Sequence, residues 1–388
     1  MIVQTVRKTF KYKLKPTLAQ ACLLERTLML CRHVYNAAVG ERREAWRLCG
    51  VSVTYYQQKA ELPDIKAAMP EYAEVYSQVL QDVVLRVDRA FHAFFQRIRE
   101  GKTPGYPRFQ GRYRYSSFTY PQVGEHGGAR LDNGFLVLSK IGRLAVRWSR
   151  PLEGTPKTVT IRREADGWYV CFSCADVPTQ PLPVTGRATG IDVGLASFAT
   201  LADGSQIANP RIFRVAELNL RRAQRRVSRR KKGSTRRREA VVLLSKAYQT
   251  VKRQRTDFHH KTAFALLREY DTIYLEDLRV ANMVRNHHLA KSISDAGWSA
   301  FRTILEAKAA CAGRQVVAVP PAYTSQACSG CGVMVTKDLS VRWHTCPDCG
   351  TSLHRDHNAA KNILRSGQQS GFGQNPQALT QPVGAYVA

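Results

Sequence analysis

The sequence predicts a multidomain α/β protein, and three regional patterns support this fold class. Apolar residues recur at helical spacing over much of 16–104, alternate with polar residues around turn signals over 105–182, and form short strands between helices over 187–367. The 388 residues are enough for two or three domains of about 150 residues each. We therefore expect a helical domain, a small β-barrel and a larger α/β part, followed by a flexible tail at 368–388.

The helical domain follows a single strand. Residues 8–15 alternate apolar with basic side chains, so we expect a half-buried strand there and assign 1–15 to the β-barrel as its first strand. A helical pattern then ends at Gly50, and a second one follows Pro70. The apolar stripe of the second helix is typical of a helix-to-helix core. This stripe consists of Leu80, Val84, Val87, Phe91 and Phe94.

The β-barrel region contains a hairpin signal and an ambiguous aromatic segment. Asp166-Gly167 lies between two apolar runs and predicts a hairpin turn. Tyrosines and arginines interleaved over 101–120 allow two interpretations, which are base stacking with phosphate neutralisation and strand core with a basic outer face. Cys171 and Cys174 lie three residues apart on an expected strand, so they point to opposite faces and are not expected to share a metal ion.

The α/β part, 187–321, alternates strands and helices around a basic insertion at about 212–270. Its expected elements are, in order, 188–192, 240–269, 271–278, 298–312 and 314–320. Arginine pairs repeat every four residues in the insertion and would follow one slowly drifting stripe of a helix. Because like charges at this spacing destabilise a helix, we interpret the run as a phosphate-binding surface. Its residues are Arg221, Arg222, Arg225, Arg226, Arg229, Arg230, Lys231 and Lys232.

The overall charge indicates a polyanionic partner. The chain has 59 Lys and Arg against 30 Asp and Glu, a net charge of +29, and a compact protein with this surplus repels itself unless a polyanion neutralises it. An anionic membrane surface is the rival to nucleic acid, but no basic amphipathic anchor stands out and no apolar run reaches the ~20 residues of a transmembrane helix. The first residues also lack a signal peptide's apolar stretch, so we expect a cytoplasmic, nucleoid-associated protein.

Four cysteines within 322–353 predict a zinc ribbon. They form two Cys-x-x-Cys-Gly knuckles separated by fourteen residues, Cys328 with Cys331 and Cys346 with Cys349. Four thiolates at this spacing are typical of one tetrahedral, structural Zn²⁺.

Three acidic residues lie at a strand end or a helix start. Asp192 and Glu276 end expected strands, and Asp356 opens the last helix, 354–367, directly after the cysteines. Such positions can converge at one edge of an α/β sheet, where three carboxylates repel one another unless cations hold them. Two Mg²⁺ or Mn²⁺ ions about 3.5–4 Å apart would do so and would support phosphodiester hydrolysis. The alternative for any one of these residues is a helix cap or a salt bridge.

In this context the C-terminal half resembles the TnpB/OrfB family, the transposon-encoded RNA-guided nucleases related to compact type V CRISPR effectors. Weaker matches extend the resemblance almost to the N-terminus. The motifs that carry it are, in chain order, Gly190-Ile-Asp192-Val-Gly194-Leu, Ser228-Arg-Arg-Lys-Lys-Gly-Ser234, Leu275-Glu276-Asp277-Leu278, Ser292-Ile-Ser-Asp-Ala-Gly-Trp298, Tyr323-Thr-Ser-Gln-Ala-Cys328, the two cysteine knuckles and Asp356-His-Asn-Ala-Ala360.

The resemblance implies a RuvC-type RNase H fold with a zinc-ribbon insertion, a wedge β-barrel and a helical recognition lobe. It implies that Asp192, Glu276 and Asp356 are the catalytic metal ligands. It also implies a guide RNA that pairs with target double-stranded DNA, while the protein reads a short adjacent motif. As readers of that motif we name four polar side chains on otherwise apolar or basic elements, Ser77, Gln78, Gln81 and Thr119.

Two other functions stay open beside the RNA-guided endonuclease. One is a conventional DNA transposase that joins strands by the same metal chemistry, and the other is a nuclease-silent, RNA-guided DNA-binding regulator. Near Asp356, Arg342 and His354 are candidates for assisting the scissile phosphate, Asn358 is a candidate for orienting a carboxylate, and His357 has no expected role.

Overall fold

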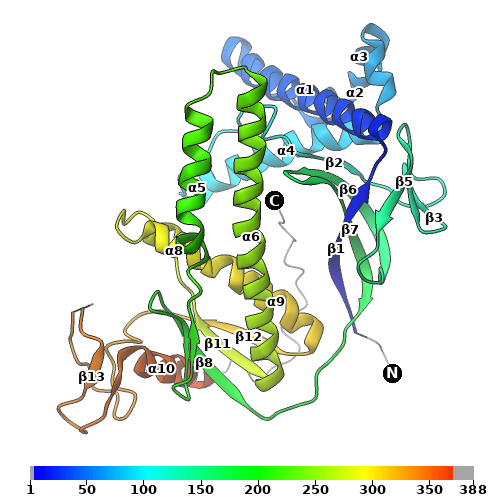
Figure 1. Ribbon diagram of the computed structural model, residues 1–388. Coiled ribbons are helices and arrows are strands. Elements are labelled where there is room, and N and C mark those ends of the chain that lie inside the picture. Colours follow the sequence, from blue (N-terminus) through cyan, green and yellow to red (C-terminus); the bar gives the residue numbers. More distant parts are fainter. Residues whose placement is uncertain (1–3, 339, 370–388) are drawn as a thin grey trace. The chain divides into compact units, whose positions relative to one another are not determined.

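The computed structural model describes residues 4–338 and 340–369, and the chain divides into two compact units, Met1–Pro178 and Thr179–Ala388 (Figure 1). The tail expected at 368–388 lies outside the described residues except for its first two, which belong to the last helix. The finer domain boundaries stay predictions from the sequence.

Helices make up most of residues 18–99 in the first unit. They are α1 (Leu18–Cys49), α2 (Tyr55–Ala60), α3 (Leu62–Ala68), the 3₁₀ helix η1 (Pro70–Glu74) and α4 (Ser77–Arg99). Thr17 and Gln20 form a capping box at the start of α1, and Gly50 ends it with a left-handed φ of 64°, as the sequence predicts. The predicted apolar stripe of α4 packs against α1, but the helix begins later than expected because the 3₁₀ turn follows Pro70 first.

The strands of the first unit form a seven-stranded antiparallel sheet in the order β2-β6-β7-β1-β5-β4-β3. They are β1 (Thr5–Lys15), β2 (Ser117–Tyr120), β3 (Ala129–Asp132), β4 (Phe135–Leu138), β5 (Gly142–Arg147), β6 (Thr155–Glu164) and β7 (Gly167–Pro178). The first strand of the chain thus lies centrally, between β5 and β7, with its alternate residues Phe10, Tyr12 and Leu14 in the core. The sheet curls, and a bridge between Val123 and Ala129 links its two edges.

Three expectations concern this sheet, and the hairpin is confirmed. β6 and β7 form a hairpin whose turn includes Asp166. Cys171 and Cys174 both lie on β7, where Cys174 is buried in the core and Cys171 is half-buried, as expected for side chains on opposite faces of a strand. In the aromatic segment Phe118 belongs to the strand core, whereas Tyr113 is 69% exposed, so both interpretations of this segment stay open.

The second unit contains a five-stranded sheet in the order β10-β9-β8-β11-β12. Its strands are β8 (Ala188–Val193), β9 (Ser197–Leu201), β10 (Gln206–Ala208), β11 (Thr272–Glu276) and β12 (Gln315–Val319). β8, β11 and β12 are parallel, while β9 and β10 run antiparallel to their neighbours. The carboxyl ends of the three parallel strands therefore lie at the same edge of the sheet.

Helices cover both faces of this sheet. The helices of the unit are α5 (Ile212–Ser228), α6 (Thr235–Glu269), α7 (Val280–Met283), α8 (Ala290–Ala296), α9 (Trp298–Ala312) and α10 (Arg355–Gln369). On one face α6 and α9 share a core with β9 through Leu266, Phe301 and Phe198. On the other face Ile363 of α10 packs against Tyr274 of β11. Since side chains alternate along a strand, residues of β8 and β11 face α10 and the α6–α9 layer in turn.

Two further segments extend from this core. α5 and the adjoining part of α6 form an antiparallel helical hairpin (Figure 1). The ribbon between β12 and α10 contains the short antiparallel pair β13 (Trp343–Thr345) and β14 (Ser352–His354). Within the described ranges 4–338 and 340–369, no helix combines the length and the apolar character that a membrane crossing needs.

Candidate active site and zinc centre

Asp192 and Glu276 lie on the face of the sheet that α10 covers. Gly190 of β8 lies against the backbone of α10, so Asp192, two residues further along, faces the same way. Tyr274 of β11 packs against α10 as well, which gives Glu276 the same direction. The two strands are parallel neighbours whose preceding residues pair directly, so the two carboxylates lie side by side.

Asp356, in the first turn of α10, completes the set. A Cβ atom built on Gly194 would lie 3.9 Å from Asp356 Oδ2, which places this carboxylate beside the turn that follows Asp192. The helix can come this close because Gly190 has no side chain, and a Cβ there would lie 2.2 Å from the carbonyl oxygen of Ala360. Thus the glycine in the strand is what permits the approach of α10.

The electrostatics of these three residues fit a site for divalent cations. Burial, followed by the charges of Glu276 and Asp356, raises the pKa of Asp192 well above its usual range, and Arg355 opposes this only in part. Burial also raises the pKa of Glu276, against a hydrogen bond from Thr324 that lowers it. Ionisation of both carboxyl groups is therefore unfavourable in the protein alone. Hard cations such as Mg²⁺ or Mn²⁺, which prefer carboxylate oxygen ligands, would remove that cost.

Thr324 also contacts this site, although no local pattern in the sequence marks it as functional. Its hydroxyl donates a hydrogen bond to Glu276 Oε1, and its backbone carbonyl accepts one from Asn362 Nδ2 at 2.8 Å. Thr324 follows Tyr323, whose left-handed φ of 63° makes the chain turn sharply after β12. The available signal was the Tyr-Thr-Ser-Gln-Ala-Cys motif, which carried the family resemblance but had no role assigned to its threonine.

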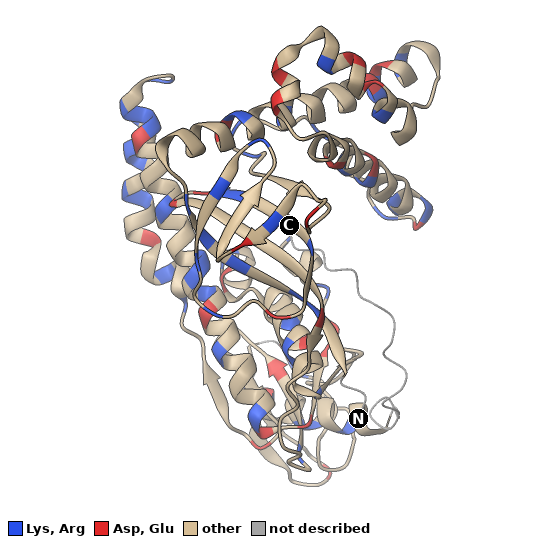
Figure 2. Cartoon of the chain, turned by 90° about the vertical axis from the view of Figure 1, so that its right-hand side faces the viewer, with Lys and Arg blue, Asp and Glu red and all other residues tan. Residues whose placement is uncertain are grey.

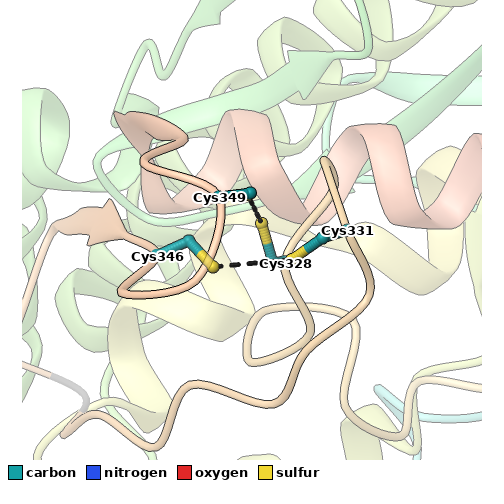
Figure 3. Close-up of side chains that lie close together, drawn as sticks. All are labelled: Cys328, Cys331, Cys346 and Cys349. Atoms are coloured by element: carbon teal, nitrogen blue, oxygen red, sulfur yellow. Dashed lines mark hydrogen bonds between the residues drawn. The ribbon is translucent and has the colours of Figure 1, made fainter.

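The four predicted cysteines meet in the ribbon (Figure 3). All four Sγ atoms lie within 4.8 Å of one another, with 3.6 Å between Cys328 and Cys349 and 3.5 Å between Cys331 and Cys346. Zinc–sulfur bonds of about 2.3 Å in a tetrahedron put the sulfur atoms about 3.8 Å apart, so this set fits one Zn²⁺ ion. Hydrogen bonds from Thr351 lower the pKa of Cys349 to about 6, which favours the thiolate that binds the metal.

Asn358 does not orient a carboxylate, so that prediction is wrong. The side chain is fully buried, its Oδ1 accepts a hydrogen bond from the Ser329 N–H at 2.8 Å, and its Nδ2 donates one to the Ala327 carbonyl at 2.7 Å. These two residues flank Cys328. Asn358 points away from the carboxylates because it lies two positions after Asp356 on the helix, and it fastens the zinc knuckle to α10 instead.

The structure places the other residues near Asp356 as follows. His357 Nε2 lies 3.1 Å from the Ala202 carbonyl oxygen and so connects α10 to the turn after β9. His354 Nδ1 accepts a hydrogen bond from the Asp356 N–H at 3.3 Å, which keeps its ring beside that carboxylate. The side chain of Arg342 is exposed. A role for His354 or Arg342 at the scissile phosphate stays a prediction.

The helical hairpin α5–α6 is strongly basic. Residues 212–269 include eighteen Lys or Arg and four Asp or Glu, a surplus of fourteen out of the net +29 of the chain. Basic residues colour much of these two helices in Figure 2, with few acidic ones among them. Of the eight residues predicted to bind phosphate, seven are exposed and Arg230 is half-buried. Arg221 is paired with Glu217, at 2.7 Å.

The four candidate readers of an adjacent motif all lie in the first unit. Ser77 accepts a hydrogen bond from a lysine of α3 at 2.7 Å, and Gln78 donates one to a glutamine amide after β2 at 2.7 Å. Thr119 accepts one from an arginine of α4 at 2.6 Å, and Gln81 is half-buried. Ser77, Gln78 and Thr119 therefore already take part in hydrogen bonds within the first unit.

Comparison with known proteins places this geometry in a family. The OrfB_IS605 family, described as "Probable transposase", matches residues 171–287, and its "Helix-turn-helix domain" matches 1–49, whose described residues form β1 and the single long helix α1. A "Putative RNA-guided DNA endonuclease" of Streptomyces pristinaespiralis is 38% identical over 402 residues, 99% of this chain and 96% of that protein. The chain belongs to the OrfB_IS605 family. A second relative, "Putative RNA-guided DNA endonuclease InsQ" of Escherichia coli strain K12, is 31% identical over 380 residues, 93% of this chain and 92% of that protein.

Matches to the ribbon and to solved structures confirm the predicted fold class. The description "Cas12f1-like, TNB domain" matches residues 298–363, which include the four cysteines and the first part of α10. The structure of the Cas12f1-sgRNA-target DNA complex covers 93% of this chain and 99% of the other, with a TM-score of 0.58 at 13% identity. The mini-RNA-guided endonuclease CRISPR-Cas_phi3 covers 93% and 92%, with a TM-score of 0.51 at 10% identity. The OrfB_IS605 chain therefore has the expected RuvC-type core with a zinc-ribbon insertion, a curled wedge sheet and a helical lobe.

Proposed function

We propose that this chain is an RNA-guided DNA endonuclease of a transposable element, which hydrolyses target DNA at Asp192, Glu276 and Asp356. The observation that supports the proposal is that the charges of Glu276 and Asp356 act on the buried Asp192, in a chain of this family that also has a four-cysteine site. The relatives from Streptomyces pristinaespiralis and Escherichia coli bear the same activity in their names.

The three carboxylates would hold two Mg²⁺ or Mn²⁺ ions. Bound ions in such a centre lower the pKa of a water molecule that attacks phosphorus and neutralise charge on the leaving 3′-oxygen. The protein supplies the positions of the ligands, since β8 and β11 fix Asp192 and Glu276 and the close approach of α10 brings Asp356 to them. The cysteines Cys328, Cys331, Cys346 and Cys349 would hold a structural Zn²⁺.

The basic hairpin α5–α6 supports nucleic acid as the partner. Its exposed arginines and lysines would neutralise phosphates of the guide RNA or of the RNA–DNA heteroduplex, while base pairing selects the target sequence. Ser77, Gln78, Gln81 and Thr119 are the proposed readers of the adjacent motif. Association with the nucleoid would follow from the DNA target.

Cleavage by the protein purified with its own RNA tests the proposal. The copurified RNA is sequenced, and DNA that matches its variable end is offered with Mg²⁺. We expect double-stranded DNA to be cut, and Glu276→Ala to reduce cleavage to background without loss of bound RNA. The matched control is Asp277→Ala, because this neighbouring carboxylate is 66% exposed and pairs with Arg302 at 2.6 Å on the surface.

The same assay separates the alternatives. A conventional transposase would give joined products that depend on Glu276, and a nuclease-silent regulator would bind matched DNA without any metal-dependent cutting. Recovery of only random cellular RNA at moderate salt would overturn the RNA-guided function and leave the basic hairpin as a non-specific surface.

A further inference from the structure

The first zinc knuckle touches two of the three elements that carry the proposed catalytic carboxylates, β11 and α10. We define it as residues 324–331, from Thr324 through Cys331. At its start the Thr324 hydroxyl donates to Glu276, which ends β11. At its centre the backbone on both sides of Cys328 bonds to Asn358, which lies two residues after Asp356 on α10.

One face of α10 is devoted to this knuckle. Asn358, Asn362 and Arg365 lie four and three residues apart, so they project from the same side of the helix. Asn362 Nδ2 donates to the carbonyls of Ala327 at 2.7 Å and Thr324 at 2.8 Å, and Arg365 donates to the carbonyl of Ser329. Asn358 is fully buried and Asn362 is 8% exposed.

Breaking the hydrogen bonds of Asn358 and Asn362 to the knuckle costs free energy. A buried amide that loses its hydrogen-bond partner keeps the full desolvation penalty, so Asn358 and Asn362 hold the knuckle in one position as long as the knuckle is ordered. Four Sγ atoms within 4.8 Å order it when a zinc ion binds them. The position of the Thr324 hydroxyl, and with it the orientation of Glu276, then follows from the zinc centre.

We propose that Thr324 and Asn358 are positioning residues through which the zinc centre sets the geometry of the catalytic carboxylates. Zinc occupancy therefore controls how tightly the carboxylate site binds Mg²⁺ or Mn²⁺, and the zinc is a regulator of the nuclease centre as well as a support for the ribbon. This inference rests on the proposed function of Asp192, Glu276 and Asp356. A purely supporting ribbon would need the contacts to α10 but not the hydrogen bond from Thr324 to Glu276.

The test measures how tightly the protein, purified with its RNA, binds Mn²⁺. Mn²⁺ is titrated into this complex, and binding is followed by electron paramagnetic resonance. Thr324→Val removes the hydroxyl while keeping the shape of the side chain. We expect it to bind Mn²⁺ about 10–100-fold more weakly, the usual effect of losing a group that orients a metal ligand, with full zinc content and an unchanged melting temperature. Thr324→Ser restores the hydroxyl and should return the affinity to near the wild-type value. Thr345→Val, in an exposed strand of the same ribbon, is the matched control.

A second variant tests the zinc itself. Cys349→Ser lowers zinc content at an exposed ligand and should weaken Mn²⁺ binding by a similar factor. If the zinc acts through Thr324, the double variant Thr324→Val/Cys349→Ser should be little worse than either single variant, since the two changes interrupt one route. Additive losses would show that the two sites act on Mn²⁺ binding independently and would overturn the proposal.

The remaining outcomes of these measurements also test the coupling between the zinc centre and the carboxylates. Wild-type Mn²⁺ affinity in zinc-loaded Thr324→Val, or in folded but zinc-depleted Cys349→Ser, would overturn the coupling and leave the proposed function intact. Equal Mn²⁺ binding by the wild type and by Asp192→Ala would show that the carboxylates do not form the ion site, and both the coupling and the proposed centre would fall. If Thr324→Val does not fold, the Cys349→Ser measurement decides alone.

Discussion

Replacing Gly190 by alanine tests how closely α10 must approach the sheet. The new Cβ would lie 2.2 Å from the carbonyl oxygen of Ala360 and 2.5 Å from the backbone nitrogen of Leu364. Both neighbours are backbone atoms of α10, so no change of rotamer relieves the contact. Ordinary contacts begin at 3.4 Å, and the helix must therefore move away from β8 by about 1 Å.

The size of the effect follows from this displacement. Overpacking of a well-packed interface costs about 1–3 kcal/mol of unfolding free energy, and each kcal/mol lowers the melting temperature of a unit this large by about 2–4 °C. The larger effect falls on cleavage, because the shift separates Asp356 on the helix from Asp192 on the strand. A displacement of about 1 Å in a catalytic group can lower the rate about 100-fold.

Two measurements check the reasoning. Single-turnover cleavage of matched DNA should slow about 100-fold at fixed Mg²⁺. Differential scanning fluorimetry should show the loss of stability. Gly111→Ala is the control, since a Cβ there meets no atom within 4 Å. If Gly190→Ala cleaves at the wild-type rate but melts at a lower temperature, the spacing between β8 and α10 does not set the metal site. If both values are those of the wild type, Gly190 does not pack against the backbone of α10 as described.

Three more predictions concern charge. Burial and neighbouring carboxylates raise the folded-state pKa of Asp192, so its ionisation opposes folding as the pH rises through that pKa. Without divalent ions, Asp192→Asn should therefore have a higher melting temperature than the wild type at neutral pH. This difference in melting temperature should vanish near pH 4. A constant difference would contradict this. Changing Arg222, Arg225 and Arg226 to glutamine should reduce the salt dependence of RNA binding. Measured by fluorescence anisotropy with single-stranded RNA, the slope of log affinity against log salt concentration should become smaller by about 2. An unchanged slope would exclude phosphate contacts by these three residues. The Arg314 side chain is 2% exposed and bonds the Asp271 carboxylate and two backbone carbonyls. Arg314→Met should therefore lower the free energy of unfolding in urea by about 3–5 kcal/mol. A loss under about 1 kcal/mol would show that the ion pair with Asp271 is dispensable.

The sequence was informative where a local pattern carries the chemistry. The spacing of the cysteines was enough to predict that the four thiols meet. The ends of two short apolar strands were enough to predict that Asp192 and Glu276 lie side by side at one edge of a parallel sheet, and their catalytic role stays a prediction. The helix that ends at Gly50 was predictable for the same reason, since its stop signal lies in the adjacent residue.

The sequence failed where a residue's role depends on a distant neighbour. Asn358 was misassigned because its position near Asp356 suggested a carboxylate partner, whereas the fold brings Ala327 and Ser329 to it from about thirty residues earlier in the chain. Thr324 was missed for the same reason, since its partner Glu276 lies 48 residues away. The requirement for glycine at position 190 could not be predicted either. A larger residue there clashes only because the backbone of α10 lies against this position of the strand.

The order of the ligands along the chain has a consequence for biosynthesis. Asp192 and Glu276 emerge early, whereas Asp356 follows the whole ribbon and lies on the helix that covers their face of the sheet. Proteins fold from the N-terminus as they leave the ribosome, so a nascent chain has two of the three proposed acidic ligands and no covering helix until residues past 356 have been made. A product that stops early, through a nonsense codon or a broken message, would be unable to cut DNA. If the three carboxylates form the centre as proposed, incomplete copies released from the ribosome are inactive as nucleases.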